Sequence, residues 1–432
     1  MDKMTKKILT VFVVVVVAAL AIFIGVRAYQ QKEAEEKAEA SLPKTEVGKL
    51  LAKDLDLEAA RLLVEWQTRL YTKMLWDSPE QIVWTNMVMP TELFYACGLA
   101  PVHAEMTAGW ISSLLLSKEY IRVAEERGFH VGLCSYHKAV IGAMECGAIP
   151  PPRLAVFSSH ICDGGNGLLQ YFRQRFRTPI FLLDIPYQQQ GERAVRFVEG
   201  QLRDLIRFLK AYTGKTLYPK ALSNAVRYSN HSRCWQQAVN ELRKGPALFY
   251  GNQALRNLFG LSFLSGSSRG EMAAEAYYRQ IKERSARPET WLSTDKPPRR
   301  ILWIHFAPLH AGDVMRYFEK TLGCLIAFDI LGYVYWPTLS EEDPIRDLAK
   351  KVLSHFFLTG SGQRMSLYRR LIEDYRIDGA VFFMHQGCRA IPGASWELRM
   401  IAEEKKIPFL ELPGDCIDPR GFSSEQVMLR ME

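Results

Sequence analysis

The sequence lacks several short motifs that identify enzyme classes directly. No two cysteines form a C-x-x-C pair, so the local signature of zinc ribbons and thioredoxin-like proteins is missing. Gly214-Lys215-Thr216 has leucine rather than glycine at position 209, so the chain shows no P-loop with which to hydrolyse ATP itself. An H-E-x-x-H motif is also missing, which excludes a zincin-type protease.

Net charge and cysteine content indicate which partners and which redox compartment suit the protein. The net charge of +8 is not gathered into a Lys/Arg stripe with interleaved aromatics, so no nucleic-acid partner is predicted. A mildly basic balance suits an anionic partner, such as the phosphates of coenzyme A or a lipid surface. Eight cysteines in 432 residues are too few for a disulfide framework and favour a reducing compartment.

The N-terminus differs from the rest of the chain. Residues 8–26 are an apolar run in which only Thr10 is polar. At about 1.5 Å per residue, such a run spans the ~30 Å hydrocarbon core of a bilayer. It exceeds the apolar region of a secretory signal peptide, so we expect an uncleaved transmembrane anchor over residues 1–27. A charged stalk is expected over residues 28–56.

Strand-like and helix-like segments alternate through the body of the chain, which predicts an α/β fold with mostly parallel sheets. We expect two Rossmann-like units, over 57–190 and 297–432, joined by a helical region over 191–296. The predicted strands are 82–89, 154–157, 180–183, 301–305, 324–328, 381–383 and 408–410.

Three cysteines lie where an apolar run meets a loop: Cys134 in GLCSYHK, Cys162 in SSHICDGGN and Cys388 in MHQGCR. The carboxyl ends of parallel strands are where ligands and catalytic groups gather. Three thiolates converging there would hold three irons of a four-iron cluster and leave the fourth open to substrate. The alternative is that they are buried, unmodified cysteines.

The segments around these cysteines carry a family resemblance. They are MPTELFYACGLAPV (89–102), CSYHKAVIGA (134–143), SSHICD (158–163), FLLDIPY (181–187), DGAVFFMHQGCR (378–389) and GDCIDPRGFSSEQ (414–426). In this order they resemble the 2-hydroxyacyl-CoA dehydratase family, which is related to the iron–sulfur subunits of benzoyl-CoA reductase. The resemblance extends from about residue 57 to the C-terminus.

The resemblance implies a [4Fe–4S] cluster bound by Cys134, Cys162 and Cys388. It implies an acyl-CoA substrate that loses water through a ketyl radical, after one-electron reduction by a separate ATP-hydrolysing activator. Family enzymes pair homologous subunits, so a heterodimer or homodimer is expected. Two other functions stay open: a benzoyl-CoA-reductase-like or double-cubane reductase, and a non-catalytic membrane-tethered partner subunit.

Further residues are candidates for the same site. Glu92 is a candidate base for the substrate's β-proton, although a carboxylate in the first turn of a helix is also stabilised by the helix dipole. His385 could donate a hydrogen bond or shuttle a proton, or be an ordinary loop histidine. The candidate cofactor-binding residues are Ser135, Asp163, Gly164 and Gly165, whose alternatives are a helix cap and a tight turn.

Some features depart from the family pattern or are left undecided. The family usually carries an arginine near His137 and Lys138, so a partner or CoA contact at that place is in doubt. Cys97 and Cys146 are either core residues or additional ligands of a larger cluster. Lysine and arginine are nearly balanced across the apolar run, but a cluster fed by ATP requires the cytoplasm. We therefore expect a single-pass, membrane-anchored protein with a cytoplasmic catalytic body.

Overall fold

The computed structural model describes residues 62–63, 70, 74–187, 191–245, 251–286, 297–388, 390 and 392–432, without the side chains of 252–257 and 392. The chain divides into two compact units, residues 1–56 and 57–432. All described residues belong to the second unit. The predicted anchor and stalk therefore lie outside the described residues.

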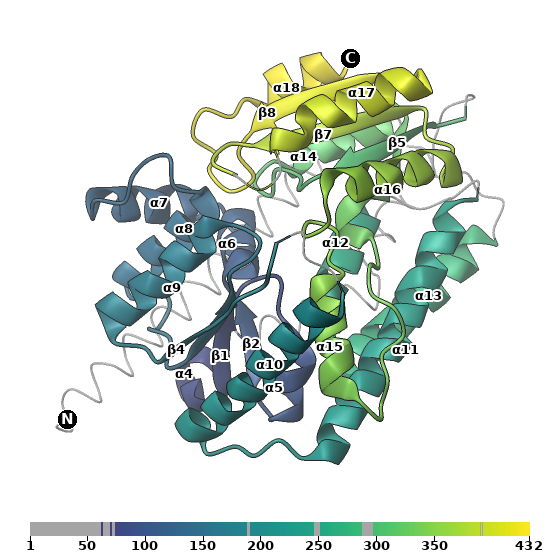
Figure 1. Cartoon of the computed structure of the whole chain (residues 1–432). Helices are drawn as coiled ribbons and strands as arrows, with labels where there is room; N and C mark the ends of the chain where they lie inside the picture. Colours follow the sequence, from purple (N-terminus) through teal and green to yellow (C-terminus); the bar gives the residue numbers. More distant parts are fainter. Residues whose placement is uncertain are drawn as a thin grey trace. The chain divides into compact units, whose positions relative to one another are not determined.

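Two parallel four-stranded sheets form the framework of the described unit (Figure 1). Their strand orders are the same: β2-β1-β3-β4 and β6-β5-β7-β8. The first sheet contains β1 (Ile82–Thr85), β2 (Ala100–His103), β3 (Ala155–Ser158) and β4 (Ile180–Leu183). The second contains β5 (Arg299–Ile304), β6 (Cys324–Asp329), β7 (Gly379–His385) and β8 (Phe409–Gly414). The predicted α/β fold with parallel sheets is confirmed.

The burial of the strands explains why apolar runs predicted most of them. All residues of β1 and β3 are buried, as expected for parallel strands with helices on both faces. β2 was not predicted because Pro101 lies inside it. Proline cannot donate a ladder hydrogen bond, but β2 is an edge strand that pairs only with β1, so the missing donor costs little there.

Helices connect and cover the strands. Those in the first part of the chain are α4 (Leu75–Asp77), α5 (Thr91–Ala96), α6 (Ala104–Ser113), α7 (Ser117–Glu126), α8 (Ser135–Glu145) and α9 (Asp163–Phe176). The middle of the chain forms α10 (Glu192–Thr213), α11 (Pro219–Arg243), α12 (Gly251–Ser262) and α13 (Ser268–Ser285). The last part forms α14 (Gly312–Arg316), α15 (Pro344–Leu353), α16 (Ser361–Asp374), α17 (Ser395–Lys405) and α18 (Ser424–Met431).

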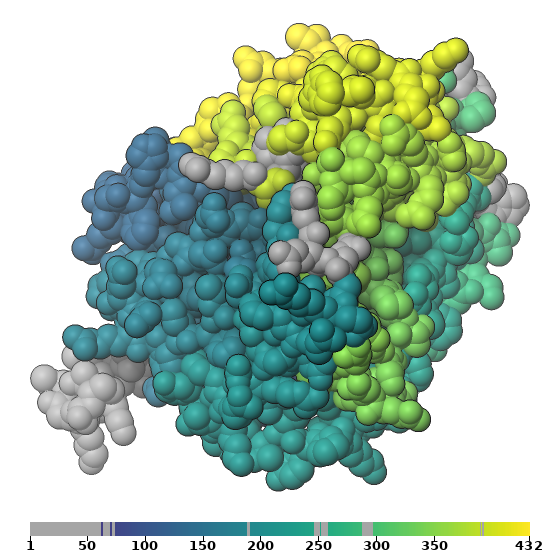
Figure 2. Space-filling model, viewed as in Figure 1, coloured from purple at the N-terminus to yellow at the C-terminus, as the bar shows by residue number. Residues whose placement is uncertain are grey.

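The two sheets share one hydrophobic core. This core includes Trp84 and Phe157 from the first sheet and Trp303 and Phe383 from the second. At the surface, α7 and the C-terminal residues adjoin (Figure 2), where Arg420 forms an ion pair with Glu125 at 2.8 Å. The shared core fixes the strand ends of one sheet against those of the other.

The prediction of a membrane-anchored protein is corrected. Among the described helices, none is long and apolar enough to cross a membrane. The long helices α10 and α11 carry arginine, lysine and glutamate along their lengths, which a bilayer core does not accommodate. The apolar run on which the prediction was based, residues 8–26, lies outside the part of the chain that the structure describes.

Candidate functional site

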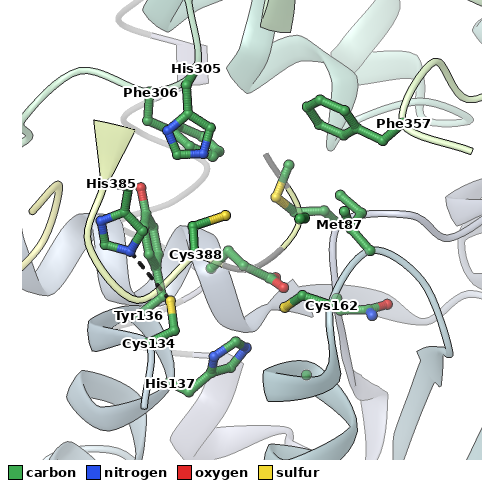
Figure 3. Close-up of a pocket in the computed structure, with 15 residues that line it drawn as sticks. Met87, Cys134, Tyr136, His137, Cys162, His305, Phe306, Phe357, His385 and Cys388 are labelled. Carbon is green, nitrogen blue, oxygen red and sulfur yellow. Dashed lines mark hydrogen bonds between the residues drawn. The ribbon is translucent and has the colours of Figure 1, made fainter. Parts of the chain in front are cut away.

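A cavity lies where the carboxyl ends of the two sheets face each other (Figure 3). It has a volume of about 620 Å³, including space open to solvent. In each sheet the strand order reverses between two central strands, β1 and β3 or β5 and β7. Ligands of open α/β sheets bind at such switch points. The residues lining the cavity that follow these strands are Asn86, Met87, Ile161, Cys162, His305, Phe306 and Cys388.

The three predicted cysteines all line this cavity, called here the cysteine cavity. Cys134 is the N-cap of α8 and Cys162 is the N-cap of α9. Cys388 follows β7, whose last residue is His385. The structure thus brings together three thiols from distant parts of the sequence (Figure 3). Two of them lie at helix N-termini, where the helix dipole favours negative charge.

Burial dominates the electrostatics of Cys134 and Cys162. Burial and the neighbouring thiolates of Cys162 and Cys388 raise the pKa of Cys134 well above its usual value. Burial raises the pKa of Cys162 to about 11, although the backbone N–H groups of Gly165 and Gly164 partly offset this. Since thiolates are the metal-binding form, bound iron would reverse these shifts and release protons.

The three thiols do not have the geometry of a single-ion site. Within the described residues, no group of three or more His, Cys, Asp or Glu side chains could hold one metal ion. A four-iron cluster binds each thiolate at a different iron, so its ligands surround a space rather than a point. None of the eight cysteines forms a disulfide.

His385 is placed to donate a hydrogen bond to a cysteine sulfur. The backbone N–H of Cys416 donates to His385 Nδ1 at 3.1 Å, so Nδ1 is the acceptor and the proton lies on Nε2. Nε2 lies 3.4 Å from Cys134 Sγ. Burial lowers the pKa of His385, and Asp415 partly offsets this. The ring is therefore neutral, with one N–H directed at the sulfur.

Three buried polar atoms of two side chains in the cysteine cavity have no hydrogen-bond partner among the described residues. Among the described residues, neither nitrogen of His137 has a partner, nor does Oε2 of Glu105, although these atoms are buried. Burial raises the pKa of Glu105 to about 7, against the lowering effect of backbone N–H groups. Burial lowers the pKa of His137 to about 4. Buried polar groups are normally satisfied, so these atoms indicate a bound ligand.

Sequence reasoning did not select Glu105, and it noted His137 only as a departure from the family. The available signal for Glu105 was its position directly after β2, in APVHAE, at a strand carboxyl end. His305 was also missed. It follows β5, lines the cysteine cavity and has a pKa lowered to about 3 by burial.

Gly164, in the first turn of α9, has a steric reason to be glycine. A Cβ on Gly164 would lie 2.9 Å from Nδ1 and Cε1 of His137, so the ring could not keep its place. Gly165 lines the cysteine cavity. Asp163 is exposed and is not among the cavity residues, and Ser135 donates to Asp415 Oδ1 at 2.7 Å. Of this predicted set, Gly165 is the residue that lines the cavity.

Glu92 lies in a buried ion pair rather than among the cavity residues. Its Oε1 accepts hydrogen bonds from Lys351 Nζ at 2.5 Å and from Ser229 Oγ at 2.6 Å. Thr91, the first residue of α5, donates to the Ser265 carbonyl at 2.7 Å. The structure therefore gives Glu92 a position suited to joining α5, α11 and α15.

The remaining candidates lie elsewhere. Cys97 and Cys146 end α5 and α8 and do not line the cysteine cavity. Lys138, at the place of the family's usual arginine, donates to Glu125 Oε1 and to the Val131 carbonyl, both at 2.7 Å. Its charge is thus directed at α7 and the following loop rather than at the cavity.

Comparison with known proteins finds a matching family and related sequences. Residues 86–432 match the family described as 2-hydroxyglutaryl-CoA dehydratase, D-component. The chain is 23% identical to the (R)-2-hydroxyisocaproyl-CoA dehydratase alpha subunit of Clostridioides difficile, over 81% of this chain and 88% of that one. It is 23% identical to the (R)-phenyllactyl-CoA dehydratase alpha subunit of Clostridium sporogenes, over 82% and 88%. It is 24% identical to one of the subunits of benzoyl-CoA reductase from Thauera aromatica, over 72% and 77%.

Proposed function

Because this chain belongs to the 2-hydroxyglutaryl-CoA dehydratase D-component family, we propose that it is the cluster-holding subunit of a 2-hydroxyacyl-CoA dehydratase. Its relatives have the names of dehydratase subunits, in keeping with a carbon–oxygen lyase. The reaction would eliminate water from a 2-hydroxyacyl-CoA through a ketyl radical. An ATP-hydrolysing activator would supply the electron, and a homologous subunit would complete the enzyme.

The observation that carries this proposal is the convergence of three cysteine thiols on one cavity. Cys134, Cys162 and Cys388 would hold a [4Fe–4S] cluster. When bound, that cluster would supply one-electron chemistry and an iron without a cysteine ligand, open to a substrate oxygen. His385 would donate its Nε2–H to the Cys134 sulfur and so tune the reduction potential.

The chain's own polar groups would handle the substrate. Glu105 would take up the β-proton, since its raised pKa of about 7 makes its carboxylate a stronger base than an exposed one. His137 would donate to the thioester carbonyl or the 2-hydroxyl group, because its nitrogens have no other partner among the described residues. Tyr136, Phe306 and Phe357 line the same cavity and would exclude water from the reacting atoms.

The match to a benzoyl-CoA reductase keeps a reductase as the second candidate. The two functions differ in electron stoichiometry. A dehydratase recovers its electron in each cycle, so one activation supports many turnovers, whereas a reductase consumes electrons for each product.

The test is an anaerobic assay with activator, ATP and the homologous partner. The enzyme should convert a 2-hydroxyacyl-CoA to its enoyl-CoA with many turnovers per electron supplied. Glu105→Gln should lower kcat by about 10²–10⁴-fold, the usual contribution of a general base, without changing iron content. Stoichiometric electron consumption would support the reductase, and full activity of Glu105→Gln would remove the proposed base.

A further inference from the structure

A coenzyme A thioester must reach the cysteine cavity from solvent. We infer that its pantetheine arm passes through a second, aromatic-walled cavity, and that its phosphates lie in a groove beside α16. We call these spaces the aromatic passage and the surface groove. The inference rests on the proposed acyl-CoA substrate and adds where the chain binds the coenzyme.

The three spaces share wall residues. The aromatic passage shares Met87 and Phe357 with the cysteine cavity. It shares Tyr333, Tyr335 and Phe356 with the surface groove. Their volumes are about 670 Å³ for the passage and 790 Å³ for the groove, including space open to solvent. Figure 3 shows Met87 and Phe357 on the side of the cysteine cavity away from His385.

The walls of the aromatic passage suit a slender, mostly apolar chain. Phe259 and Phe263 form one wall, with ring centroids 4.8 Å apart. Tyr335 packs against Trp336 at 4.9 Å on another wall. Such walls accommodate the methylene groups and the dimethyl-substituted carbon of pantetheine.

Unpartnered donors indicate what the passage binds. Trp336 Nε1 and His103 Nε2 line it and are buried, and neither has a hydrogen-bond partner within the described residues. An indole N–H can only donate, so it requires an acceptor such as an amide carbonyl. The pantetheine arm carries two amides. The passage thus offers apolar walls and a donor to a ligand that is apolar between two carbonyl groups.

The surface groove supplies a charge that suits phosphate. Arg370 lines it and is exposed, and it forms no ion pair with any described residue. Its neighbour Arg369 is instead paired with Glu404 at 2.8 Å. An arginine fork binds phosphate oxygens well. Placing the coenzyme's phosphates here leaves the pantetheine arm to extend inward along the row of cavities.

The test is calorimetric binding of two non-reacting thioesters, 4-methylpentanoyl-CoA and 4-methylpentanoyl-N-acetylcysteamine, to the full chain. The second lacks the phosphates but keeps one amide. Arg370→Glu should weaken binding of the CoA thioester about tenfold and leave the truncated thioester unchanged. Arg316→Glu makes the same charge change at an exposed residue of α14 and should not alter the binding of either thioester. Trp336→Phe should weaken the binding of both thioesters about five- to tenfold, whereas Trp396→Phe should weaken the binding of neither.

Equal affinities of wild type and Arg370→Glu for the CoA thioester would refute the binding of the phosphates in the surface groove. Unchanged affinities of Trp336→Phe for both thioesters would refute the binding of the pantetheine arm in the aromatic passage. Thermal unfolding of each variant separates misfolding from lost contacts, and the truncated thioester provides an internal control for Arg370→Glu. A chain that binds the thioesters as expected, yet holds no iron and forms no enoyl-CoA, would refute the proposed function alone.

Discussion

The buried pair of Glu92 and Lys351 allows structure and catalysis to be separated. The exposed fractions of their side chains are 0% and 5%, and their charged atoms lie 2.5 Å apart. Lys351 Nζ also lies 4.5 Å from the centroid of the Trp336 ring. Removing one partner leaves the other charge buried without a counter-ion, which costs about 3–5 kcal/mol. Glu92→Gln and Lys351→Met should each lower the free energy of unfolding by this amount.

The double variant Glu92→Gln/Lys351→Met should recover most of that loss, because neither charge then remains buried alone. Urea unfolding followed by tryptophan fluorescence measures the free energy of unfolding of all four proteins. Dehydratase activity of the folded Glu92→Gln variant should stay within about tenfold of wild type, since Glu92 lines neither the cysteine cavity nor the aromatic passage, whereas Lys351 lines the passage. A Glu92→Gln variant that is as stable as wild type but inactive would refute the structural role and restore Glu92 as the base.

Three further outcomes follow from the site. His385→Leu should keep its iron but show a more negative reduction potential in an EPR-monitored titration, because a hydrogen bond to sulfur stabilises the reduced state; an unchanged potential would contradict this. Gly164→Ala should lose about 1–3 kcal/mol of stability through its contact with His137, whereas Gly167→Ala, with nothing within 4 Å, should not. In iron-free protein, burial raises the Glu105 pKa from 4.5 to about 7, so the folded state holds that proton more tightly. Urea unfolding gives the free energy of unfolding of wild type and of Glu105→Gln at each pH. The advantage of wild type over the variant should fall as pH rises from 4.5 to 7, and a difference that does not change with pH would refute the raised pKa of Glu105.

The sequence predicted those strands whose apolar residues are buried in the folded chain. Apolar runs identified seven of the eight described strands, because central parallel strands are buried on both faces. Residues 180–183 match β4 at both ends. β7 begins and ends two residues beyond the predicted 381–383, since Gly379 and His385 pair with neighbouring strands although neither is a typical strand residue. The ends of β7 are therefore determined by pairing with neighbouring strands, which local composition does not encode.

The site was predictable where its residues stand in recognisable segments. Cys134, Cys162 and Cys388 were selected in this way, and the structure places all three at one cavity. Glu105 was not selected, because one glutamate in a short segment looks the same whether exposed or buried. Its unpartnered oxygen appears only when the chain is folded around it. Glu92 shows the converse, since its ion pair with a lysine 259 positions away cannot be read from sequence.

The central claim is that three cysteines hold one iron–sulfur cluster. Anaerobically purified protein should contain about four irons and four sulfides per chain, as a [4Fe–4S] cluster requires. Cys134→Ala, Cys162→Ala and Cys388→Ala should each lose the iron and the visible absorption, whereas Cys234→Ala, at an exposed cysteine outside the cavity, should keep both. Iron and sulfide analysis of these four variants is the direct measurement. Full iron content in any of the three cavity variants would contradict the ligand set.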